Sequence, residues 1–213
     1  CFASSGCPNA LLSDELLVPR IELLVQSKRL RDALLSRVDG ELKFHHEMQI
    51  VVAGCPNACS RPQVADIGLI GASFPFIRSS LCNQCKKCVA ACIEHAVDFR
   101  PKNAAYPEIN SAICVACGQC CRACHTGTIT SQRKGYRILI GGKLGRHPQL
   151  GKEIPGIYTD DEVITVINAA LTFYLDNMQF GERFGDILNR AGYTTFINFL
   201  KATTFDLSQG DCQ

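Results

Sequence analysis

The chain contains fourteen cysteines among 213 residues, and in most cases two or three residues separate a cysteine from the next one. Thiols this close in sequence suit metal binding, because several thiolates must converge on one inorganic unit. They are poorly spaced to cross-link long loops as disulfides, which is the other common use of many cysteines in a short chain. We therefore expect reduced, metal-binding thiols and a cytoplasmic, anaerobic setting.

Eight of these cysteines form two copies of the pattern C-x2-C-x2-C-x3-C. The first copy is Cys82, Cys85, Cys88 and Cys92, and the second is Cys114, Cys117, Cys120 and Cys124. Every member of the second copy follows its counterpart by 32 residues. The segment is therefore predicted to be an internal duplication.

This pattern is typical of ferredoxins with two 4Fe–4S clusters, in which the fourth cysteine of each copy ligates the other cluster. The predicted ligand sets are Cys82, Cys85, Cys88 and Cys124 for one cluster, and Cys114, Cys117, Cys120 and Cys92 for the other. A pair of zinc sites is the alternative, but a zinc ribbon uses two C-x2-C pairs and not triplets with a trailing cysteine. The spacing favours Cys120 over the adjacent spare thiol Cys121 and leaves an exchange between them open.

Four more cysteines form a second group outside the duplication. Cys1 and Cys7 give C-x5-C, and Cys55 and Cys59 lie in the segment Gly-Cys-Pro-Asn-Ala-Cys, directly after a predicted strand. Glycine, proline and asparagine favour a tight turn, which can present two thiolates and backbone N–H groups to one cluster. By spacing alone, these pairs are ambiguous between zinc, an iron–sulfur cluster and two disulfides.

The elements that must hold these cysteines follow from the apolar periodicity. Helices are predicted over 11–38, 160–178 and 182–191, strands over 49–53, 67–70 and 136–140, and a last apolar segment over 195–200. Residues 76–131 are rich in cysteine, alanine and short polar residues and leave no room for a large apolar core. The sequence therefore predicts an α/β (α+β) domain, formed by residues 1–75 and 132–213, that is interrupted by a small two-cluster ferredoxin-like insert at 76–131.

The composition argues against some classes of function. Lys and Arg number 22 against 20 Asp and Glu, and this formal net charge of +2 argues against electrostatic binding to nucleic acid or to a membrane. No stretch has the length of a transmembrane helix, and no signal peptide is visible. The first residue is Cys1 and not methionine, so we expect that an upstream segment is missing.

The second cysteine group resembles that of a known family. C-x5-C followed by Gly-Cys-Pro-Asn-x-Cys is similar to the signature of the sirohaem–4Fe–4S site of sulfite and nitrite reductases, and the order of the parts also matches. The segments 65–71 and 136–148 resemble stretches on either side of the insert in the same family. The chain is most similar to the anaerobic (dissimilatory-like) sulfite reductase type with an inserted two-cluster ferredoxin domain.

This resemblance implies three 4Fe–4S clusters and a sirohaem. The third cluster would be held by Cys1, Cys7, Cys55 and Cys59. Cys59 would also be the proximal ligand that bridges to the sirohaem iron. Sirohaem carries many carboxylates that need cationic partners, and the candidates are Arg61, Lys143, Arg146 and His147.

The implied function is the six-electron reduction of sulfite to sulfide, or of nitrite to ammonia. Electrons would enter through the insert from a ferredoxin or flavoprotein donor. In the family, the basic side chains that bind the oxyanion lie mainly in an upstream half. We therefore expect an N-terminal half or a partner chain to complete the sirohaem pocket, and no catalytic residue is assigned here.

The alternative is an iron–sulfur electron-transfer subunit of a larger redox complex, without its own catalytic site. A plain electron relay does not need the Gly-Cys-Pro-Asn-x-Cys segment, so that segment favours the reductase. Cys212 lies in a polar tail and has no assigned role.

Overall fold

One mixed sheet organises the computed structural model, which describes residues 1–36, 41–43, 46–78, 81–101, 104–179 and 181–204. Its strands follow the order β1-β2-β5-β6, with the bounds Ile50–Ala53, Ile67–Ile77, Ile129–Ile140 and Lys152–Tyr158. Strand β1 is parallel to β2, and the other neighbours are antiparallel. The strands predicted from the sequence near residues 50, 67 and 136 are confirmed, as is the mixed α/β class.

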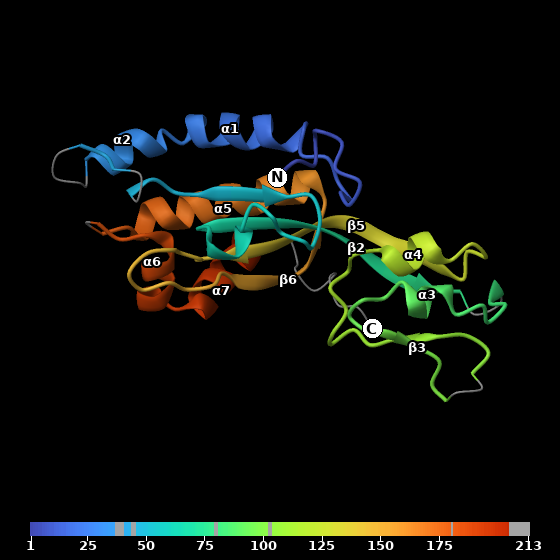
Figure 1. Cartoon of the computed structure of the whole chain (residues 1–213). Helices are drawn as coiled ribbons and strands as arrows, with labels where there is room; N and C mark the ends of the chain where they lie inside the picture. The colour runs from blue at the N-terminus through green and yellow to red at the C-terminus, as the bar shows by residue number, and fades with distance from the viewer. Residues whose placement is uncertain (37–40, 44–45, 79–80, 102–103, 180, 205–213) are drawn as a thin grey trace.

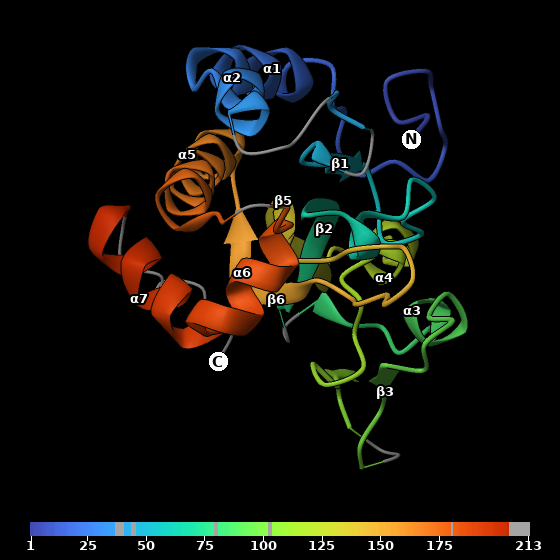
Figure 2. The ribbon, with the colours of Figure 1, turned by 90° about the vertical axis from the view of Figure 1, so that its left-hand side faces the viewer.

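The larger helices cover one side of this sheet. They are α1 (Leu17–Ser27), α2 (Leu30–Leu35), α5 (Asp160–Asn177), α6 (Phe184–Ala191) and α7 (Tyr193–Thr203). Figure 2 shows them together, whereas the N-terminal loop and the short helices α3 (Lys87–Ala90) and α4 (Gln119–Ala123) lie on the other side. In the described part of the chain, no helix is long and apolar enough to cross a membrane.

Helix α5 forms the centre of the apolar core. It buries Val163, Val166, Ile167, Ala170, Leu171 and Tyr174 at helical spacing, so the helix predicted over 160–178 is confirmed. Edge-to-face aromatic contacts connect it to α6 and α7. The ring centroids are 5.3 Å apart for Phe173–Phe196, 5.8 Å for Phe184–Phe196 and 5.9 Å for Tyr174–Phe184.

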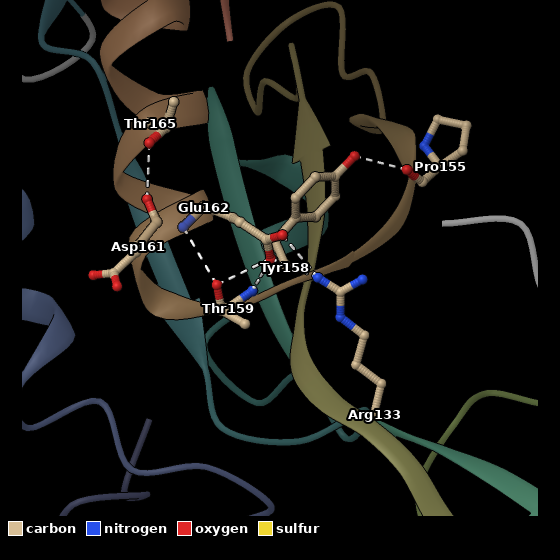
Figure 3. A network of polar contacts seen from close by, with 7 residues as sticks. All are labelled: Arg133, Pro155, Tyr158, Thr159, Asp161, Glu162 and Thr165. Atoms are coloured by element: carbon tan, nitrogen blue, oxygen red, sulfur yellow. Dashed lines mark hydrogen bonds and ion pairs between the residues drawn. The ribbon is translucent and has the colours of Figure 1, made fainter. Parts of the chain in front are cut away.

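A polar network fixes the first turn of α5 to strand β5 (Figure 3). Thr159 and Glu162 form a capping box, in which Thr159 N–H donates to Glu162 Oε2 at 2.6 Å. Arg133 of β5 donates to both oxygens of the same carboxylate, at 2.9 and 2.6 Å. Because one carboxylate makes both contacts, the beginning of the helix stays beside the strand.

Strands β2 and β5 are longer than the sequence predicts. Their pairing runs from Ile67↔Ile140 to Ile77↔Ile129, so both strands continue from the main sheet into the cysteine-rich segment (Figure 1). The sequence predicts only the halves that lie in the main sheet, because the other halves contain polar residues, glycine and Pro75. Proline cannot donate to a strand ladder, and Pro75 lies at a register shift of this pair.

Two other elements differ from the prediction. The helix predicted over 11–38 is two helices, because Arg29 adopts a left-handed backbone conformation with φ 48° between α1 and α2. Residues 37 and 38 of that prediction lie outside the described residues. Strand β6 has no counterpart in the prediction, since Pro155 and Gly156 interrupt its apolar pattern, and both are tolerated at the edge of a sheet.

Candidate metal centre

The duplicated cysteine segment folds as two equivalent halves. Helix α3 carries Cys88, and α4 carries Cys120 at the equivalent position. Left-handed backbone conformations recur at the 32-residue offset in three pairs: Gln84 and Ala116, Lys86 and Gly118, His95 and Gly127. The backbone thus repeats at the same 32-residue offset as the cysteine pattern.

Each half ends in a pair of antiparallel strands, but the two pairs have different surroundings. In the first half, β3 (Val97–Asp98) pairs with β4 (Glu108–Ile109). In the second half, the equivalent pairing is between the start of β5 and the end of β2. Equivalent backbone bonds follow both, from Asn110 N–H to Ala96 O at 2.8 Å and from Arg78 N–H to Thr128 O at 2.7 Å. The second half is thus part of the main sheet, and the first is a separate hairpin.

Thiols from the two copies lie near one another. Burial raises the pKa of the Cys114 thiol, and two thiols of its own copy raise it further, together with Cys92 of the other copy. Burial also raises the pKa of Cys88, with an added contribution from Cys124 of the other copy. Each triplet therefore has the fourth cysteine of the opposite copy close by, as the predicted exchange of ligands requires.

Backbone N–H groups point at several of these sulfurs. Ala96 donates to Cys92 Sγ at 3.2 Å, and Ile129 donates to Cys124 Sγ at 3.3 Å. A hydrogen bond to sulfur favours the thiolate and tunes the potential of a bound cluster. Cys92 and Cys124, which the pattern assigns to different clusters, thus each accept a backbone hydrogen bond at sulfur.

The cysteines are available as ligands. Across the described residues, all thirteen cysteines have free thiols. In the same ranges, no three His, Cys, Asp or Glu side chains converge closely enough to hold a single metal ion. A cubane carries its irons on separate corners, so its thiolates surround a cluster and need not meet at one ion.

The loop of Cys55 and Cys59 leaves strand β1 in a tight turn, as the sequence predicts. Ala58 N–H donates to Cys55 O at 3.1 Å, and Ala58 is left-handed with φ 50°. The short 3₁₀ helix η2 (Pro62–Val64) then leads into β2. Within the turn, Cys55 is buried, with 7% of its surface exposed, whereas Cys59 is exposed.

The N-terminal loop closes over this turn. Leu11 N–H donates to Gly54 O at 2.9 Å, and Gly54 N–H donates to Cys1 Sγ at 3.5 Å. The approach needs glycine at position 54, because a Cβ there would lie 2.5 Å from Ala3 Cβ and 2.7 Å from Leu12 O. Cys1 is therefore brought to the turn that holds the second cysteine pair, and Cys7 is half-buried in the same loop.

The second copy of the duplication lies against the same loop. Ser73 N–H of β2 donates to Ala116 O at 2.8 Å. Arg122 Nη1 donates to the carbonyl oxygen of Pro8, directly after the first cysteine pair, at 3.4 Å. In the first copy, by contrast, Cys85 is exposed. These two hydrogen bonds thus attach the second copy to β2 and to the N-terminal loop.

The predicted cationic residues are found in different surroundings. Lys143 Nζ forms an ion pair with Asp186 of helix α6. Arg61 is exposed and left-handed, with φ 59°, just after the cysteine turn. Arg146 and His147 are exposed in the loop that follows β5. Arg61 and Arg146 are therefore accessible, whereas Lys143 already has a partner.

A buried ion pair that sequence reasoning did not identify holds the start of β2. Arg183 donates to the Asp66 carboxylate, and the two side chains are 19% and 2% exposed. Gln49 N–H also donates to this carboxylate, at 2.9 Å. Gly141 N–H donates to Asp66 O at 2.7 Å, so the same residue anchors the glycine-rich loop that carries Lys143. The partners lie far apart in sequence, and no spacing pattern reveals them.

Comparison with known proteins identifies the family. Residues 1–204 match the nitrite and sulphite reductase 4Fe-4S domain, and the chain belongs to this family. This confirms the resemblance seen in the cysteine motifs.

Individual relatives are sulfite reductases by name. The chain is 37% identical over 159 residues to the coenzyme F420-dependent sulfite reductase of Methanocaldococcus jannaschii, covering 73% of this chain and 25% of that protein. It is 33% identical over 159 residues to a subunit of the anaerobic sulfite reductase of Salmonella typhimurium, covering 71% of this chain and 46% of that protein. The matched region is thus less than half the length of either relative.

A solved structure has the same fold. Dissimilatory sulfite reductase I superposes with a TM-score of 0.62 at 17% sequence identity, over 100% of this chain and 53% of that chain. At this identity, the likeness concerns the fold alone.

The Asp66–Arg183 pair gives a prediction with a defined pH dependence. Arg183→Met should lower the free energy of unfolding by about 3–5 kcal/mol near neutral pH, because it leaves an uncompensated buried carboxylate. Burial already raises the folded-state pKa of Asp66. The folded variant therefore binds more protons than the unfolded chain, and its deficit should shrink as the pH falls.

Urea unfolding of both proteins at about pH 7 and about pH 5 measures this effect. The double variant Asp66→Asn/Arg183→Met is the control, and it should recover most of the loss, since no buried charge remains. A deficit of the same size at both pH values would contradict the role given to the carboxylate.

Proposed function

We propose that this chain is the cofactor-binding half of a sirohaem-dependent reductase that reduces sulfite to sulfide. The observation that carries this proposal is the closure of the N-terminal cysteine loop over the turn of Cys55 and Cys59. Membership of the nitrite and sulphite reductase family supports it. Sulfite is favoured over nitrite because the relatives from Methanocaldococcus and Salmonella are named for sulfite.

Three 4Fe–4S clusters are part of the proposal. Their ligands are Cys82, Cys85, Cys88 and Cys124 for the first, Cys92, Cys114, Cys117 and Cys120 for the second, and Cys1, Cys7, Cys55 and Cys59 for the third. The nearness of Cys92 to Cys114 and of Cys124 to Cys88 supports the exchange of fourth ligands between the first two. The hydrogen bond from Gly54 to Cys1 supports the third.

Cys59 is proposed as the thiolate shared by the third cluster and the sirohaem iron. A sirohaem held there beside the third cluster would supply the successive electrons that reduction of an oxyanion requires. Cys55 is enclosed by the turn, while Cys59 is exposed, so its sulfur has room for a second metal. This contrast in burial supports the choice of Cys59, which the resemblance alone implied.

The exposed cations near the turn are proposed to bind the sirohaem carboxylates. Arg61 stands two residues after Cys59, and Arg146 extends from the glycine-rich loop. Lys143 can join them only by sharing its ammonium group with Asp186 or by leaving that partner. We therefore expect Arg61 and Arg146 to contribute more to cofactor retention than Lys143.

Electrons are proposed to pass through the duplicated segment, acting as a ferredoxin-like insert, in one order. They enter from a ferredoxin or flavoprotein at the first cluster, because its ligand Cys85 is exposed. They leave through the second cluster, because Ser73 and Arg122 attach that copy to β2 and to the N-terminal loop. A partner chain or an upstream half would then complete the pocket for the oxyanion.

The alternative remains an electron-transfer subunit without a catalytic site. The two functions are separated by a visible spectrum of the anaerobically purified protein, with iron and acid-labile sulfide counted on the same sample. Sirohaem bands, with more iron than two cubanes contain, are expected for the reductase. A plain cluster spectrum with the iron of only two cubanes would favour the relay.

Cys59→Ser tests the shared thiolate. The variant should keep the iron of the first two clusters but lose the electronic coupling between sirohaem and the third cluster, and sulfite reduction should fall by at least about 100-fold. Electron paramagnetic resonance of the reduced protein measures the coupling. Cys212→Ser is a matched control in a cysteine outside all three ligand sets. Undiminished sulfite turnover by Cys59→Ser would refute the assignment.

Cys85→Ser tests the route of the electrons. Loss of a ligand at the first cluster should slow reduction by a protein donor, while the sirohaem spectrum stays unchanged, because the insert has its own small apolar cluster of side chains. Stopped-flow reduction with a ferredoxin donor measures the rate. A small chemical reductant provides the control, since it can reach the inner centres directly. Joint loss of the sirohaem bands would argue against a separate electron-transfer insert.

A further inference from the structure

Cys121 belongs to none of the three proposed ligand sets, yet it lies among their thiols. It follows Cys120 in helix α4 and is half-buried in the same small apolar cluster as Cys124. Cys120 is buried in this cluster, and Cys92 also packs against it. Cys121 is therefore packed beside two proposed ligands of the second cluster.

The internal duplication offers a comparison for this position within the same molecule. The counterpart of Cys121, 32 residues earlier, is Val89, and it packs against the same apolar cluster. Packing alone thus requires only a small apolar side chain at either site, and free cysteine satisfies that requirement. The thiol at position 121 adds a metal-binding group beside a proposed ligand, which valine cannot supply.

We propose that Cys121 is an alternate ligand of the second cluster, able to replace Cys120 beside Cys92, Cys114 and Cys117. The inference rests on the proposed cluster assignment. The two cysteines are adjacent residues of α4 and pack in one apolar cluster, so the exchange needs no movement of the sheet. The first copy has no second thiol at this position, because the residue after Cys88 is Val89.

The exchange is balanced in atoms and charge. The iron–sulfur bond to Cys120 breaks, and a bond to Cys121 forms on the same iron. The proton of the Cys121 thiol passes to the sulfur of Cys120, on the adjacent residue. One thiolate replaces another, so neither the charge nor the electron count of the cluster changes, and no oxidant or reductant is required.

The test compares Cys120→Ala with Cys88→Ala, the equivalent change in the first copy. Both variants are made in the full chain and purified without oxygen, and iron and acid-labile sulfide are counted per protein. Cys88→Ala should lose up to about four irons, the content of one cubane. Cys120→Ala should keep the wild-type content, because Cys121 takes the vacated position. Cys120→Ala/Cys121→Ala should lose as much iron as Cys88→Ala.

Two further variants complete the design. Cys121→Ala alone should keep all its iron, since Cys120 is then the ligand. Cys88→Ala/Val89→Cys should regain the iron that Cys88→Ala loses, because it creates in the first copy the arrangement of the second. If Cys120→Ala does not fold, this regain of iron tests the inference in its place.

Equal iron loss in Cys120→Ala and Cys88→Ala would overturn the inference, as would a Val89→Cys change that restores nothing. A wild-type protein with iron for fewer than three cubanes and no sirohaem bands would count against the proposed function instead. The two failures are therefore distinguishable on the same set of samples.

Discussion

The pairing of β2 with β5 determines where every part of the candidate site lies. This antiparallel pair continues, with a register shift near Pro75, from the helical layer into the cysteine-rich segment. Strand β1 pairs with β2, and the turn of Cys55 and Cys59 follows directly after β1. Strand β5 ends at the glycine-rich loop, and Ser73 of β2 bonds to the second cysteine copy. Antiparallel pairing fixes which residues of the two strands lie opposite each other, so the loops that leave these strands keep fixed positions relative to one another.

Burial then distinguishes thiols that the sequence presents as equivalent. Cys55 and Cys59 lie in one short motif, yet only Cys55 is enclosed by the turn. In the duplicated segment, Cys88 and Cys120 are buried at equivalent positions, whereas Cys85 is exposed. A thiolate shielded from water changes the potential of its cluster, while an exposed one lets a donor protein approach. The proposed direction of electron flow follows from this gradient of exposure.

Local patterns predicted the parts of the fold that depend on nearby residues. The cysteine copies followed from their spacing, and α5 followed from its apolar period. The rest depends on contacts between distant segments. Half of the β2–β5 pair contains residues that disfavour strands, and it forms because its partner strand is adjacent. Asp66 and Arg183 meet although 117 residues separate them, and Lys143 meets Asp186 over a separation of 43 residues. The ligand sets themselves stay predictions that spacing and neighbouring thiols support.

The two strand pairs of the duplicated segment are alike in backbone but differ in how they tolerate a change of length. The pair formed by β2 and β5 belongs to the main sheet, so an insertion within either strand would shift the register of that sheet. The hairpin of β3 and β4 pairs only with itself. Residues can be added to or removed from its connecting loop without altering the sheet. This hairpin is therefore the part of the duplicated segment whose length can change while the strands that position the cysteine turns keep their register.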